Sequence, residues 1–129
     1  MKNNALRNTL QITKALSDAH RLRILMLLRD GELCVCQIME VFGLAMSTIS
    51  KHLSILAAAD LVVSRKEARW AYYRLPTTSE NKQIKTILKW IRQSLQDDDQ
   101  IRNDHQKLTI DVACTPQDLR KRQTKGTIR

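Results

Sequence analysis

The spacing of apolar side chains predicts four consecutive helices in the first half of the chain. Apolar residues recur there every three or four positions, which is the period of an α-helix. The helices are expected over about residues 4–16, from the N-cap Asp18 to Gly31, over about 35–42, and from Ala45 or Ser47 onward. The inward faces of the last three are expected to be Leu22, Leu25, Met26 and Leu28; Ile38, Val41 and Phe42; and Ile49, Leu53 and Leu56.

After Asp60 the pattern changes from helical to alternating. The segments LVVSRK and RWAYYRL are rich in β-branched and aromatic residues, and Glu67-Ala68 separates them. This composition predicts a β-hairpin that ends at Pro76. The connection contains neither Gly nor Asn, so the pattern is compatible with a tight turn or with a longer charged loop.

The last periodic segment predicts one long helix. Its apolar positions are Ile84, Ile87, Leu88, Ile91 and Leu95, and the helix is expected to continue through Ile101 to about Leu108. One small domain cannot easily cover so long an apolar stripe, which favours a homodimer built through the terminal helices. The alternative is a monomer in which this helix folds back on the first one.

Length and charge narrow the class of protein. A chain of 129 residues corresponds to one core, expected over residues 1–109, with a flexible tail over 110–129 that contains Cys114. The chain has 22 Lys and Arg against 13 Asp and Glu, a net charge of +9, which favours a polyanionic partner. No apolar run approaches the roughly 20 residues of a membrane helix, and the first residues do not resemble a signal peptide. We therefore expect a cytoplasmic protein with no membrane partner.

The order of the expected elements is that of a mainly α winged helix-turn-helix with a β-hairpin wing, which reads double-stranded DNA. The second helix of the pair enters the major groove, so its exposed face carries short polar or basic side chains. Here that face would be Ser47, Thr48, Ser50, Lys51 and His52. The wing residues expected near phosphates or the minor groove are Arg65, Lys66 and Arg69. The alternatives are that the hydroxyls cap the helix, that His52 is an ordinary surface histidine, and that Arg65 and Lys66 lie in a solvated turn.

Two cysteines one residue apart, Cys34 and Cys36, precede the reading helix. An odd number of cysteines argues against a disulfide framework, and thiolates at a helix start bind soft ions. On an ideal helix these side chains point about 200° apart, so one ion contacts both sulfurs only where the helix is distorted. Ion binding would then disturb the helix that supports the reading helix. The alternative is that both are small buried apolar residues.

The ligand count bears on the identity of the ion. Tetrahedral Zn²⁺ needs four ligands, whereas the chain has three Cys and three His. Three thiolates suit As(III) or Sb(III), acting as an inducer and not as a permanent cofactor. Cys114 is the candidate for the third sulfur, from the same subunit or from its partner. The alternative is an incidental thiol in the tail.

The segment from ELCVCQI through MSTISKHLSILAAADLVVSRKEARWAYYRLP resembles the arsenical-resistance repressors of the ArsR/SmtB family, over about residues 10–95. The resemblance implies a homodimeric repressor on an operator upstream of arsenic-resistance genes, released by As(III) or Sb(III). Cys34 and Cys36 fall on the family's inducer motif, and the predicted reading helix falls on its recognition helix. Some arsenic sensors carry a third cysteine where this chain has Met39, so Cys114 is not carried over from the family.

Other ions and other functions remain as alternatives. Zinc-sensing relatives place Asp, His and Glu ligands on the last helix; Asp104 and His105 occur here without a matching downstream pair, so no zinc site is predicted. Cadmium and lead sensors also use thiolates. A repressor that senses oxidants through Cys34 or Cys36 is the main alternative. An enzyme is not expected, because the chain has neither a Gly-rich loop nor a C-x-x-C pair.

Overall fold

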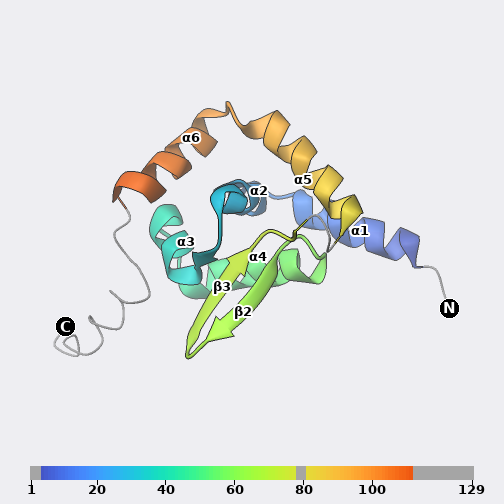
Figure 1. Ribbon diagram of the computed structural model, residues 1–129, viewed down its shortest axis with the longest axis horizontal. Helices are drawn as coiled ribbons and strands as arrows, with labels where there is room; N and C mark the ends of the chain where they lie inside the picture. The colour runs from blue at the N-terminus through green and yellow to red at the C-terminus, as the bar shows by residue number, and fades with distance from the viewer. Residues whose placement is uncertain (1–3, 78–80, 112–129) are drawn as a thin grey trace.

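A computed structural model describes residues 4–77 and 81–111. The last two helices of the described chain arch over the preceding helices, and a hairpin projects from the opposite side (Figure 1). In chain order the elements are α1 (Ala5–Leu16), α2 (Ala19–Leu27), the 3₁₀ turn η1 (Leu28–Asp30), β1 (Leu33–Cys34), α3 (Val35–Phe42), α4 (Met46–Ala58), β2 (Val63–Glu67), β3 (Trp70–Arg74), α5 (Lys82–Leu95), α6 (Asp99–Gln106) and the π-helical turn η2 (Lys107–Asp111).

The first four helices form where the apolar spacing predicts them. The Asp18 carboxylate caps α2 by accepting hydrogen bonds from the backbone N–H groups of His20 (2.8 Å) and Arg21 (3.2 Å). Gly43 ends α3 with φ of 67°, a left-handed conformation that favours glycine, and turns the chain into α4. The helix-turn-helix of α3 and α4 is therefore set by local sequence.

The β-sheet contains one strand that the sequence pattern did not predict. β2 and β3 form the expected antiparallel hairpin, and β1 pairs with β3 on its other side, with Cys34 opposite Tyr72. β1 has two residues, which is too short for an alternating pattern. The predicted turn is wrong by one position, because Glu67 pairs with Trp70 and the turn residues are Ala68 and Arg69.

The prediction of one long C-terminal helix is wrong. α5 ends at Leu95, and the chain bends before α6 starts at Asp99. Asp98 is the N-cap of α6, and its carboxylate accepts from the backbone N–H groups of Gln100 (2.9 Å) and Ile101 (3.3 Å). A cap with extended backbone interrupts a helix, which explains the break.

The bend lets both helices cover the subunit's own core. Ile84, Ile91 and Ile101 are each at most 4% exposed and join the same apolar cluster as the inward faces of α2, α3 and α4. The subunit covers this stripe only in part, because Ile87, Leu88 and Leu95 of the same stripe remain half-buried. Among the described residues, the exposed large apolar side chains are instead Leu6, Leu10, Met46 and Trp90.

Among the described residues, no single helix has the length and apolar character needed to cross a membrane. α3 and α4 reach that length and apolar character only when taken together, and the two helices are bent by 116° relative to one another.

Candidate DNA interface and thiol site

The exposed side of α4 is polar and basic, and its inner side holds the helix on the core. Ile49, Leu53 and Leu56 are 0% exposed. The predicted reading residues Ser47, Thr48, Ser50 and Lys51 are exposed. No side-chain hydrogen bond caps the start of this helix at Ala45. The short polar groups therefore face solvent, where the edge of a base pair can meet them.

His52, the remaining residue predicted on this face, is half-buried against α2. Arg21 donates from Nη1 to His52 Nδ1 at 3.2 Å, which requires a neutral ring with its proton on Nε2. The His20 ring lies 5.5 Å from the His52 ring. Arg21 also donates to the Ala15 carbonyl (2.8 Å), so it joins the end of α1 to α4. His52 thus braces the reading helix on the domain.

The surroundings of His52 make this contact sensitive to acid. Burial lowers the pKa of His52 below its usual 6.5; the Asp18 carboxylate opposes the shift, and the charges of Arg21, His20 and Lys51 reinforce it. Below about pH 6.5 the unfolded chain protonates this ring more readily than the folded chain does. Stability is therefore expected to fall as the pH drops from that value through the lower folded pKa.

We expect wild type to lose more unfolding free energy than His52→Gln between about pH 7.5 and about pH 5.5. Urea unfolding at the two pH values measures the difference. His105→Gln, which removes a histidine on α6 that does not contact α4, is the control. Equal losses in wild type and His52→Gln would show that the His52 contact does not titrate.

All three predicted basic residues of the hairpin are exposed, but Arg65 is engaged by two carboxylates. Lys66 and Arg69 are exposed near the tip, with Arg69 in the turn itself. Arg65 instead donates to both Glu32 oxygens (2.8 and 2.7 Å) and to Glu67 (2.7 Å). These bonds fix the hairpin to the loop before β1. They also engage the Arg65 guanidinium, so Lys66 and Arg69 are the better candidates for phosphate contacts at the tip.

The two predicted inducer cysteines lie at the junction of β1 and α3. Cys34 is 0% exposed and has extended backbone angles (φ −77°, ψ 149°), while Cys36 is 8% exposed in the first turn of α3. Neither cysteine forms a disulfide bond. The Cys34 N–H donates to Oε1 of Gln37 at 2.8 Å, which closes the start of the helix. One cysteine is therefore outside the helix already, so a shared ion needs less distortion than a regular helix would impose.

This junction connects to both elements of the candidate DNA interface. Cys34 pairs with Tyr72 on β3, the inner strand of the hairpin. Cys36 lies in α3, which packs against α4. Movement of the two sulfurs toward one another would therefore reach the hairpin and the reading helix together.

The described residues do not complete an ion site by themselves. Within residues 4–77 and 81–111, no group of three or more His, Cys, Asp and Glu side chains is placed to hold a metal ion. Cys114, the predicted third sulfur, lies outside the described residues, as does most of the predicted tail.

Comparison with known proteins identifies the family. Residues 18–64 match the family model described as bacterial regulatory protein, arsR family. The chain is 40% identical over 67 residues to the arsenical resistance operon repressor of Escherichia coli (strain K12), covering 51% of this chain and 57% of that protein. It is also 40% identical over 75 residues to the arsenical resistance operon repressor of Bacillus subtilis (strain 168), covering 57% of this chain and 71% of that protein. This chain belongs to the ArsR family.

A solved structure of a related DNA-binding domain shares the fold. It is the homodimeric winged helix-turn-helix DNA-binding domain Mb0332 from Mycobacterium bovis, described as a possible ArsR-family regulator. Its TM-score is 0.61 at 26% identity, covering 74% of this chain and 89% of that one. The predicted winged helix-turn-helix, the family resemblance and the absence of an enzyme function are confirmed. The chain spans between 51% and 62% of the length of the first three curated relatives.

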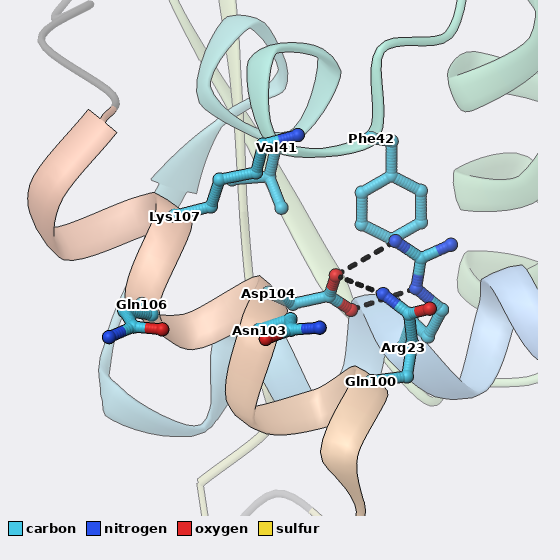
Figure 2. Close-up of a pocket in the computed structure, with 8 residues that line it drawn as sticks. All are labelled: Arg23, Val41, Phe42, Gln100, Asn103, Asp104, Gln106 and Lys107. Atoms are coloured by element: carbon cyan, nitrogen blue, oxygen red, sulfur yellow. Dashed lines mark hydrogen bonds and ion pairs between the residues drawn. The ribbon is translucent and has the colours of Figure 1, made fainter.

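One buried group in this ArsR-family chain had no signal in the sequence pattern. Asp104 on α6 forms two hydrogen bonds of 2.8 Å with Arg23 on α2, at the edge of a pocket of about 490 Å³ (Figure 2). The partners are 81 positions apart, so local periodicity could not relate them. In the sequence, Asp104 stands out only beside His105 as part of an incomplete zinc motif, and nothing marks Arg23.

Proposed function

We propose that this chain is a metalloid-responsive repressor that binds double-stranded operator DNA as a homodimer. As(III) or Sb(III) bound at Cys34 and Cys36 releases it. The observation that carries the proposal is the position of the two thiols, at the junction of β1, which pairs with the β3 strand of the wing, and α3, which packs against α4. The names of the curated relatives support the choice of inducer.

The proposed DNA contacts come from two surfaces. α4 supplies base and phosphate contacts in the major groove, and the wing tip supplies phosphate or minor-groove contacts beside it. The proposed residues are Ser47, Thr48, Ser50, Lys51, His52, Arg65, Lys66 and Arg69. His52 and Arg65 already form hydrogen bonds with other protein groups, so we expect the remaining members to contribute more to DNA affinity.

Release follows from the burial of the thiols. Because Cys34 and Cys36 are almost inaccessible, an ion reaches both sulfurs only when the β1–α3 junction opens. The opened junction no longer holds α3 and β3 in their DNA-binding arrangement. A coupling free energy of about 1–3 kcal/mol between the two sites would lower operator affinity about 5–150-fold.

A third sulfur from Cys114 would complete a trigonal thiolate site of the kind that suits As(III) and Sb(III). Cadmium and lead also bind thiolates, so they are the competing ions. A redox sensor is a weaker candidate, because oxidation of a thiol depends on its exposure and both described thiols are buried.

The operator complex tests the proposed function directly. We expect arsenite to dissociate a selected operator duplex from the purified protein at concentrations where hydrogen peroxide has no effect. Fluorescence anisotropy follows the release, and Cd²⁺ is titrated in parallel. Release by peroxide alone would favour the redox sensor, and release by neither would remove the sensor assignment.

The proposed dimer surface lies on α1 and α5. Leu6 and Leu10 on α1 and Trp90 on α5 are 77%, 49% and 64% exposed. A small cavity lined by Gln11 of α1 and Gln83 of α5 shows that the start of α5 lies near α1. Exposed apolar side chains on neighbouring helices fit an interface with a second copy of the chain.

Leu10→Glu with Trp90→Glu is expected to yield a monomer with little operator affinity. Each fully buried apolar side chain contributes about 1.5–3 kcal/mol, so losing two per subunit should weaken the dimer at least about 1000-fold. Sedimentation velocity measures the change. Gln11→Glu with Gln93→Glu adds the same charge to the same helices and should remain dimeric. A dimeric Leu10→Glu, Trp90→Glu protein would place the interface elsewhere.

A further inference from the structure

A groove between α2 and α5 has an apolar floor and a basic rim. Its volume is about 410 Å³, which lies within the roughly 300–1,000 Å³ of sites that bind small molecules. The floor is made of buried and half-buried apolar side chains from α2, from α5 and from the chain after β3, among them Leu25, Met26, Leu75 and Leu88. The rim is made of four cations: Arg29, Lys85, Lys89 and Arg92.

The rim cations have no acidic partner in the described parts of the chain. Within residues 4–77 and 81–111 the ion pairs involve other basic side chains: Arg23, Arg65, Arg102 and His105. Lys and Arg stems often cover apolar surface, but here they leave the groove open between them. Because the four like charges repel one another, an anion placed between them is attracted to all four.

Two of the rim cations are held in place by the backbone of the α2 side. Arg29 donates from Nη1 to the Met26 carbonyl at 3.3 Å, and Arg92 donates from Nη2 to the Arg29 carbonyl at 3.4 Å. A guanidinium has five N–H donors, so each arginine keeps further donors for a ligand. A carboxylate matches this fork with two parallel hydrogen bonds. The rim is therefore suited to the head of an organic anion, and the floor to its apolar body.

The groove lies apart from the surfaces proposed to bind DNA, the inducer and a second subunit. The described residues that line it include none from α4, the wing tip or the β1–α3 junction. At about 100° per residue, Lys85, Lys89 and Arg92 lie roughly 100–160° around α5 from Trp90. A second copy of the chain on the Trp90 side of α5 therefore leaves the groove accessible.

We propose that this groove is a binding site for an organic anion with an apolar body, such as a medium-chain carboxylate. The cations of the rim hold its charged head, and its chain lies on the floor formed by α2, α5 and the residues after β3. The inference goes beyond the proposed function, because it uses none of the residues proposed to bind DNA or the metalloid.

Calorimetric titration with decanoate, below the concentration at which it forms micelles, tests the site. We expect saturable binding of one decanoate per subunit. Acetate lacks the apolar body and 1-decanol lacks the charge, so each is expected to bind at least about 10-fold more weakly. Equal binding of acetate would show an adventitious ion only, and equal binding of 1-decanol would show apolar contact alone. Either result, or no binding of decanoate, would overturn the inference.

Lys85→Gln with Arg92→Gln tests whether the ligand sits in this groove. We expect decanoate binding to weaken about 5–25-fold, because each exposed ion pair contributes up to about fivefold. Both side chains are exposed, so the fold should persist. Lys14→Gln with Lys107→Gln removes two exposed charges outside the groove and should bind decanoate like wild type. Equal weakening in the two variants would show that net charge, and not the groove, attracts the anion.

Two further measurements keep the location and the kind of ligand testable. The NMR signals of the Leu75 and Leu88 methyl groups are expected to shift when decanoate is added, and those of Leu108, which does not line the groove, are expected to stay in place. The reverse pattern would place the ligand elsewhere. Phosphatidylglycerol vesicles are titrated in parallel. Vesicle binding without decanoate binding would show that the rim contacts a membrane surface, and it would overturn the inference.

Discussion

A variant with Cys34→Ser and Cys36→Ser is expected to bind operator DNA like wild type and to remain bound when arsenite is added. The hydroxyls cannot replace soft thiolates as ligands, so the whole coupling, about 5–150-fold in operator affinity, should disappear. Neither cysteine lies on the exposed face of α4 or at the wing tip, so DNA binding itself should persist. Anisotropy titration of the operator complex with arsenite measures both properties.

Stability must be separated from sensing in this experiment. A buried hydroxyl without a partner costs about 1–3 kcal/mol, and both positions are buried. Cys34→Ala with Cys36→Ala avoids buried hydroxyls and should give the same arsenite-insensitive repressor. Normal release of either variant by arsenite would remove the inducer site from the β1–α3 junction.

Ser50→Ala with Lys51→Ala is expected to weaken operator binding by about 2–4 kcal/mol, or roughly 30- to 1000-fold, if each residue makes one good contact. Both side chains are exposed on α4, and neither packs in the core, so the fold should be unaffected. The affinity is measured for operator and for an unrelated duplex at one salt concentration, because phosphate contacts depend on salt.

Lys89→Ala is the matched control for this pair. It removes one positive charge from an exposed position on α5, away from α4 and the wing. It should leave operator affinity within a few-fold of wild type. If Lys89→Ala and the α4 variant weaken binding equally, then net charge, and not the face of α4, accounts for the affinity.

The sequence pattern correctly predicted the elements that depend on residues close together in the chain. The apolar period located α1 to α4, Asp18 marked the start of α2, and Gly43 marked the turn before the reading helix. The apolar period gave a wrong or incomplete prediction where a single capping residue or a two-residue strand determines the structure. Asp98 breaks the C-terminal helix as an N-cap, although the apolar period continues beyond it. β1 exists only because Leu33 and Cys34 pair with β3.

The sequence predicted which residues belong to the candidate site, but it did not predict the contacts that these residues make. The exposed face of α4 and the two thiols were found because spacing and chemistry mark them. The engagement of Arg65 by Glu32 and of His52 by Arg21 could not be read from the sequence, since the partners are 33 and 31 positions apart. Such pairs arise from how the helices and the hairpin pack, and they separate exposed DNA-contact candidates from bracing residues.

The most direct test of the switch follows arsenic–sulfur bonding and DNA release in the same sample. Arsenite is titrated into the operator complex, X-ray absorption reports the fraction of arsenic bound to sulfur, and anisotropy reports the fraction of DNA released. The proposed mechanism predicts that the two fractions rise together in wild type. Full occupancy of the Cys34 and Cys36 sulfurs by arsenic, with the protein still bound to its operator at the original affinity, would contradict it.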